Sequence, residues 1–141
     1  MAALDTAVRM LARREHSAFE IRRKLKLRDI DDAEIEQAVE RLQQEGLLSD
    51  QRYAESYIHM RMGKGYGPLR IALELRERGV AESDYGHYLY DRDIDWRSVL
   101  KAAYDKKFGS SSCDDYREKA KRVRYLQYRG FALDEIHELL E

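Results

Sequence analysis

The chain has 141 residues, a single cysteine and a formal net charge of −1. That length fits one ordinary domain or three very small ones, and a lone cysteine excludes an internal disulfide bond. No apolar stretch approaches the roughly 18 residues that can span a bilayer, and the N-terminus has no signal-peptide pattern. We therefore expect a cytoplasmic protein with no membrane segment, in a reducing compartment that tolerates a free thiol.

The first third of the chain predicts three short helices. Apolar residues at helical spacing indicate the first helix, which runs to about Arg14. Ser17–Glu20 has the pattern of a capping box and begins the second helix. Asp31–Glu34 begins a third helix, and Gly46 is well placed to end it. The residues predicted to point inward are Leu4, Val8, Leu11, Ala18, Ile21, Leu25, Ile35, Ala38, Val39 and Leu42.

The second third repeats this scheme. Asp50 is predicted to cap a helix that stops at the glycine-rich segment Gly63–Gly67. Pro68 then occupies the first position of the next helix, where a backbone N–H would have no hydrogen-bond partner within the helix, so its absence costs nothing. Gly79 ends that helix, and a short helix follows over about 83–90. The inward residues are predicted to be Tyr53, Ala54, Tyr57 and Ile58, followed by either Leu69, Ala72 and Leu75 or Ile71 and Leu75.

The last third again predicts three helices. Asp95 caps the first of them, which ends at Gly109, and Asp115 precedes a longer one. Residues 133–140 form the last helix. The inward residues of the first two are predicted to be Trp96, Val99, Leu100, Tyr104, Tyr116, Ala120, Val123 and Leu126. Because strand alternation with turn dipeptides is absent, we assign the fold to the all-α class.

The sequence also repeats itself at a spacing of about 50 residues, within the range typical of repeat proteins. Arg78–Gly79 matches Arg129–Gly130, and the apolar residues around the two pairs align. Units of such an array bury their apolar faces against their own helices and their neighbours. We therefore predict three tandem three-helix repeats, over residues 1–48, 49–94 and 95–141, that form an elongated, modular and monomeric body. Arrays of this kind usually serve as surfaces for other macromolecules.

The residues give little support for catalysis. The four histidines are scattered, and none lies at metal-ligand spacing from another or from Cys113. Gly63–Gly67 lacks the Gly-Lys-Ser/Thr ending of a phosphate-binding loop, so a helix connector that needs positive φ is the better interpretation. We therefore expect no enzyme activity, no cofactor and no metal.

Basic residues, by contrast, gather in three places along the chain. Arg22 and Lys26 fall on one face of their predicted helix. Such clusters suit phosphates or acidic protein surfaces, and the alternative is a solvated face balanced by the acids of the third helix. The candidate residues for contact with a partner or DNA are Arg22, Arg23, Lys26, Arg61, Lys64, Arg70, Arg117, Lys121 and Arg124.

Several motifs occur in an order that resembles one bacterial protein family. The central motifs are Ser49–Glu55, Arg61, Gly65–Ile71, Glu74–Leu75 and Arg78–Val80. The outer motifs are Leu11–Ser17, Asp93–Trp96 and Tyr125–Phe131. Over almost its whole length, the chain resembles the RecX family of bacterial recombination regulators.

This resemblance implies a non-enzymatic cytoplasmic protein that binds the RecA recombinase. Family members lodge in the groove of the RecA–DNA filament and restrain its ATPase, strand-exchange and co-protease activities, which limits recombinational repair and the SOS response. The resemblance also implies contact with DNA, single- or double-stranded, and supplies no catalytic residues. The alternative function is a helix-turn-helix DNA-binding regulator. The slightly negative net charge and the lack of an Arg/Asn/Gln array aimed at base edges disfavour that alternative.

Overall fold

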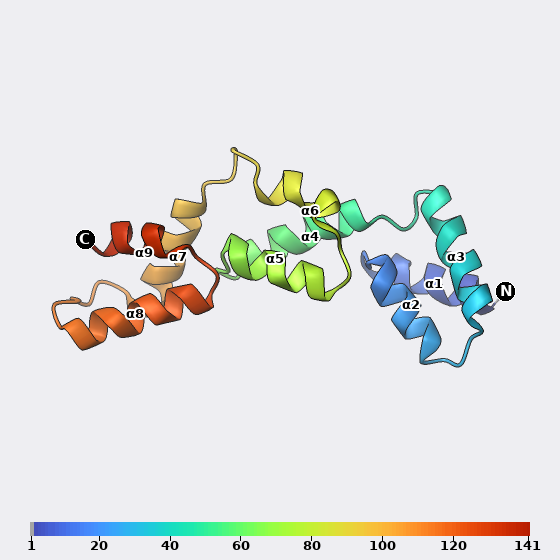
Figure 1. The fold of residues 1–141 in the computed structure, drawn as a ribbon, viewed down its shortest axis with the longest axis horizontal. Coiled ribbons are helices and arrows are strands. Elements are labelled where there is room, and N and C mark those ends of the chain that lie inside the picture. The colour runs from blue at the N-terminus through green and yellow to red at the C-terminus, as the bar shows by residue number, and fades with distance from the viewer. Residues whose placement is uncertain (1) are drawn as a thin grey trace. The chain divides into compact units, whose positions relative to one another are not determined.

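The computed structural model describes residues 2–141, and over this range the chain forms nine helices and no strand (Figure 1). The prediction of an all-α protein is confirmed. The helices are α1 (Ala2–Arg13), α2 (Ala18–Lys26), α3 (Asp32–Gln44), α4 (Asp50–Gly63), α5 (Pro68–Glu77), α6 (Glu82–Leu89), α7 (Trp96–Phe108), α8 (Tyr116–Tyr128) and α9 (Leu133–Leu140). We refer to α1–α3, α4–α6 and α7–α9 as the first, second and third helix groups.

Most of the predicted helix starts are confirmed. The Ser17 hydroxyl accepts a hydrogen bond from the Glu20 N–H at 3.1 Å, and the Glu20 carboxylate accepts one from the Ser17 N–H, which completes the capping box of α2. Asp95 and Asp115 cap α7 and α8 through their side chains. Pro68 is the first residue of α5.

The prediction that Asp50 caps α4 is wrong. Asp50 is itself the first residue of α4, and the hydroxyl of Ser49 accepts a hydrogen bond from the Arg52 N–H at 3.2 Å. The Asp50 carboxylate instead accepts the N–H of Ala18, the first residue of α2, at 2.8 Å. Burial in this position raises the pKa of Asp50, although the bond from Ala18 opposes the shift. Asp50, predicted to cap α4, therefore accepts a hydrogen bond from a free N–H at the start of α2.

The described chain packs as two compact units, and both take residues from the second helix group. One unit comprises the residues up to Ser56 together with Leu75–Tyr85, and the other comprises Tyr57–Glu74 and Gly86–Glu141. In the first unit, α1, α2 and α3 enclose a core of Ile21, Leu25, Ile35, Ala38, Val39, Leu42 and Leu48. Helix α1 contributes Ala3 and Ala7, so the predicted inward position of Val8, which is 42% exposed, is wrong.

In the second unit, α7, α8 and α9 enclose Leu100, Ala103, Leu126, Phe131 and Ile136. The predicted inward position of Tyr116 is wrong, because this side chain is 84% exposed at the start of α8. The two alternatives for α5 are also resolved: Ile71 and Leu75 are buried, whereas Leu69 is 60% exposed.

The repeated Arg–Gly pair lies in a turn that packs closely against the start of another helix. In the first unit, the Ser17 hydroxyl donates a hydrogen bond to the carbonyl of Arg78 at 2.9 Å. Gly79 has a φ of 75°, and a Cβ atom placed on it would lie 2.4 Å from Cβ of Phe19. The turn after α5 is therefore pressed against the start of α2, and no side chain larger than a hydrogen atom fits between them.

The same close packing occurs in the second unit, between the Arg129–Gly130 turn and the start of α5. The N–H of Gly67 donates to the carbonyl of Arg129 at 2.7 Å, and the N–H of Leu69 donates to the carbonyl of Gly130 at 3.0 Å. A Cβ atom on Gly130 would lie 2.3 Å from Cβ of Arg70. In each unit, the start of the middle helix of one group therefore packs on the turn that ends the middle helix of the next.

Candidate functional site

Two basic residues of α2 form ion pairs with α3. Arg22 Nε lies 2.8 Å from a carboxylate oxygen of Glu36, and Lys26 Nζ lies 2.6 Å from Asp32. The hydrogen bond to Asp32 raises the pKa of Lys26. Arg23 is exposed. For Arg22 and Lys26, the geometry matches the alternative interpretation, a solvated face balanced by acids of the third helix.

The basic residues of α8 are placed differently. Arg117, Lys121 and Arg124 are exposed, and none of them forms an ion pair with another residue in the range 2–141. Their charges therefore remain available to an external partner, in contrast to those of Arg22 and Lys26.

Arg122, in the middle of this basic stretch, has a structural role. The residue is 3% exposed, and its guanidinium group donates to Glu118 at 3.0 Å and to the Tyr104 hydroxyl at 2.7 Å. It also donates to the carbonyls of Ser111 and Ser112. Arg122 thus holds the loop before α8 against α7 and α8. The basic stretch of α8 therefore contains both a buried structural arginine and exposed cations.

Arg61 and Arg70 converge on one buried carboxylate. Glu74 is 7% exposed, and it accepts hydrogen bonds from Arg61 at 2.8 Å through both nitrogens of a bidentate pair. Arg70 Nε donates to the same group at 2.9 Å, and the hydroxyl of Tyr57 donates at 2.8 Å. Two of the candidate contact residues are therefore engaged within the protein.

We expect the Glu74→Gln variant to lose about 2 kcal/mol of stability at neutral pH, because two half-buried guanidinium groups would lose their counter-charge. Burial opposes ionisation of Glu74, but the hydrogen bonds from Arg61, Arg70 and Tyr57 outweigh it and hold the pKa below the usual 4.5. A lowered pKa contributes stability that is fully present above the unfolded-state value and is lost as the pH falls through the folded-state value.

The measurement is urea unfolding of both proteins between pH 7 and pH 3. The gap in unfolding free energy should be largest near neutral pH. It should begin to shrink below about pH 4.5, where the unfolded-state carboxylate takes up a proton, and should be lost as the pH falls through the lower folded-state pKa. Glu77→Gln, on the exposed side of the same helix, is the control and should leave stability unchanged. A pH-independent gap would contradict the assigned charge of Glu74.

Arg129 and Arg61 enclose the ring of Tyr66. The guanidinium carbons lie 3.7 Å (Arg61) and 3.8 Å (Arg129) from the ring centroid. Arg129 also donates to the carbonyl of Gly65 at 3.1 Å and to the carbonyl of Lys64. The glycine-rich segment, in which Gly65 has a φ of 83°, is thus a connector held in one conformation by an arginine of the next group.

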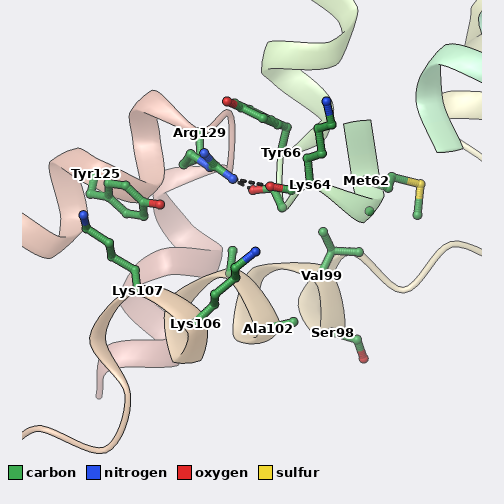
Figure 2. Close-up of a pocket in the computed structure, with 13 residues that line it drawn as sticks. Met62, Lys64, Tyr66, Ser98, Val99, Ala102, Lys106, Lys107, Tyr125 and Arg129 are labelled. Carbon is green, nitrogen blue, oxygen red and sulfur yellow. Dashed lines mark hydrogen bonds between the residues drawn. The ribbon is translucent and has the colours of Figure 1, made fainter. Parts of the chain in front are cut away.

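Beside this connector lies a cavity of about 770 Å³ (Figure 2). It is bounded by the end of α4, by α7 and by α8, and its floor includes Val99, Ala102 and Ala103. Its lining includes the basic residues Lys64, Lys106, Lys107 and Arg129, and no carboxylate of the described residues lines it. Figure 2 shows Lys106 and Lys107 rising from α7 beside Arg129 and Tyr125.

Of the nine predicted contact residues, only Lys64 lines this cavity. Arg61 and Arg70 are paired with Glu74, and none of the predicted contact residues of α2 and α8 lines the cavity. The sequence interpretation missed Lys106, Lys107 and Arg129. Lys106 and Lys107 occupy the last turn of α7, where basic residues are common because they suit the helix dipole. The signal for Arg129 was its place in the repeated Arg–Gly pair.

The described residues contain no cluster of three or more His, Cys, Asp or Glu side chains that could hold a metal ion. Within residues 2–141, no helix combines the length and apolar character needed to cross a membrane.

Comparison with known proteins gives the family. Three family models match the chain in order: the first three-helix domain of RecX over residues 3–42, the second over 49–85 and the third over 95–140. The chain is 45% identical over 135 residues to regulatory protein RecX of Pseudomonas putida (strain GB-1), covering 96% of this chain and 86% of that protein. It is 44% identical over 140 residues to regulatory protein RecX of Ectopseudomonas mendocina (strain ymp), covering 99% and 93%.

Solved structures are similar over nearly the whole chain. A crystal structure of regulatory protein RecX matches with a TM-score of 0.80 at 22% identity, covering 99% of this chain and 70% of that one. RecX from Lactobacillus salivarius matches with a TM-score of 0.74 at 23% identity, covering 99% and 94%. These likenesses support the fold, and the family models and close relatives together show that the chain belongs to the RecX family of regulatory proteins.

Proposed function

We propose that this protein is a non-enzymatic regulator that binds the RecA nucleoprotein filament. It restrains the ATPase, strand-exchange and co-protease activities of RecA in the cytoplasm, and thereby regulates recombinational repair and the SOS response. Its three helical domains, residues 1–48, 49–94 and 95–141, act together as a binding surface.

The observation that carries this proposal is the match of all three RecX domain models, in order, along one chain. The exposed cations support it in chemical terms. Arg117, Lys121 and Arg124 have no counter-charge among residues 2–141, and such side chains pair with carboxylates or phosphates, both of which a protein–DNA filament offers.

The test is ATP hydrolysis by RecA on single-stranded DNA, measured against increasing concentrations of this protein. We expect hydrolysis to fall, and we expect the inhibition to weaken as the salt concentration rises, because exposed charges are screened. The protein alone, assayed in parallel, should hydrolyse no ATP. Unchanged RecA activity at saturating protein would contradict the proposal. Inhibition that reflects only removal of free DNA would favour a DNA-binding regulator.

A further inference from the structure

The cavity beside the Gly63–Gly67 connector gathers positive charge without compensation. Lys64 and Lys106 form no ion pair with any residue in the described range, and Lys107 lies 5.3 Å from the centroid of the Tyr125 ring. On α2, by contrast, α3 supplies carboxylates to Arg22 and Lys26. Because like charges repel, cations held together with no carboxylate in the lining favour an external anion.

The wall of this cavity is already organised. Arg129 is fixed by the carbonyls of Lys64 and Gly65 and by the ring of Tyr66. A Cβ atom on Gly65 would lie 3.0 Å from an Arg129 nitrogen and 3.4 Å from Cβ of Ala103, so the connector packs closely on α7 and α8. A ligand would therefore meet a preformed charged wall, so little conformational entropy of the protein would be lost on binding.

The aromatic rings disfavour recognition of nucleic-acid bases. Arg61 and Arg129 stand over the ring of Tyr66, and Lys107 and Arg129 lie within 6 Å of the Tyr125 centroid. Base recognition in single strands needs open aromatic faces. A net charge of −1 also lacks the domain-wide basic character typical of nucleic-acid binding.

The remaining chemistry suits carboxylates on a peptide. A volume of about 770 Å³ accommodates a few side chains of a peptide. The small apolar floor of Val99, Ala102 and Ala103 can contact the methylene groups of Glu or Asp side chains. Lys106 and Lys107 then meet the carboxylates as flexible point charges.

We propose that this cavity binds a short acidic peptide segment of a protein partner. Carboxylates of the segment pair with Lys106 and Lys107, while Arg129 supports the wall against which the segment lies. This inference goes beyond the RecA proposal, because it specifies a site and a ligand chemistry without depending on which protein supplies the segment.

The test is fluorescence anisotropy with a labelled hexaglutamate peptide and the full chain at low salt. The Lys106→Glu/Lys107→Glu double variant should bind at least tenfold more weakly. The matched control is Arg9→Glu/Arg13→Glu, which makes the same charge change at exposed positions of α1 and should bind like the parent. Circular dichroism and thermal melting establish that each variant is folded. The single variants Lys106→Glu and Lys107→Glu should each also bind more weakly than the parent.

Three results would overturn the proposal: no binding of hexaglutamate by the parent, equal losses in the α7 and α1 variants, or tighter binding of a thymidine oligonucleotide of equal charge that the α7 variant abolishes. The last result would assign the cavity to nucleic acid.

RecA ATPase inhibition, measured on the same proteins, separates the two proposals. A parent that binds peptide without inhibiting RecA contradicts the proposed function alone, and one that inhibits RecA without binding peptide contradicts the cavity assignment alone.

Discussion

Replacing Gly79 by alanine is expected to lower the free energy of unfolding by about 1–3 kcal/mol more than replacing Gly46, because of overpacking. Both glycines have a φ of 75°, so the backbone strain of an alanine is the same at the two positions, about 1–2 kcal/mol. A Cβ atom on Gly46 meets nothing within 4 Å, whereas one on Gly79 would lie 2.4 Å from Cβ of Phe19. The difference between the two variants therefore isolates the close packing of the Arg78–Gly79 turn against α2.

The measurement is urea unfolding of the parent, Gly79→Ala, Gly46→Ala, Phe19→Ala and the Gly79→Ala/Phe19→Ala double variant. Removing the Phe19 ring should recover part of the loss at Gly79, since this ring is also within 3.1 Å of the added atom. If Gly79→Ala and Gly46→Ala lower the free energy of unfolding equally, the turn and α2 separate readily in solution.

The first helix group carries the same turn in altered form, and the change has a physical reason. Arg28–Asp29 precedes Ile30 as Arg78–Gly79 precedes Val80, and Asp29 has a φ of 59°. Asp29 is exposed, so positive φ alone is tolerated by an aspartate. Glycine occurs where another helix start lies against the turn, which indicates that close approach, rather than backbone conformation, is what the repeated glycine serves.

Much of the fold could be predicted because the signals are local. The capping box at Ser17 depends on residues three apart, and Pro68 marks the start of α5 by its own chemistry. The errors arose where a tertiary contact decided the outcome. Val8 belongs to an apolar stripe, but α1 approaches its neighbours through Ala3 and Ala7, whose small side chains allow close packing. Asp50 caps an amide that is 32 residues away in the chain.

The candidate site was less predictable for the same reason. Basic residues are visible in a sequence, but their partners are not. The i,i+4 spacing allows Arg70 to pair with Glu74 and Arg122 with Glu118, but nothing local indicates that Arg61 joins Glu74 or that Arg122 binds the loop before α8. The cavity joins a connector to a helix end more than thirty residues later, so no motif describes it.

Reversing Arg117, Lys121 and Arg124 to glutamate is expected to weaken inhibition of RecA by roughly tenfold or more, because each reversal removes an attraction and adds a repulsion of up to about 1 kcal/mol. All three side chains are exposed and unpaired within residues 2–141, so the folded state should be unaffected. The readout is the protein concentration that halves RecA ATP hydrolysis, at two salt concentrations, with circular dichroism to confirm the fold.

The comparison is the triple reversal of Arg22, Arg23 and Lys26, which changes the net charge equally. Here Glu36 and Asp32 already neutralise two of the three cations, so a partner gains less from them and their loss should weaken inhibition less. This variant also places like charges together, so its melting temperature should fall. If it weakens inhibition as much as the α8 variant, α2 contributes to the binding surface, either through the exposed Arg23 or through release of Arg22 and Lys26 from their carboxylates. If neither folded variant differs from the parent, both helices are excluded as the binding surface, and the Arg61–Arg70 segment is the next to test.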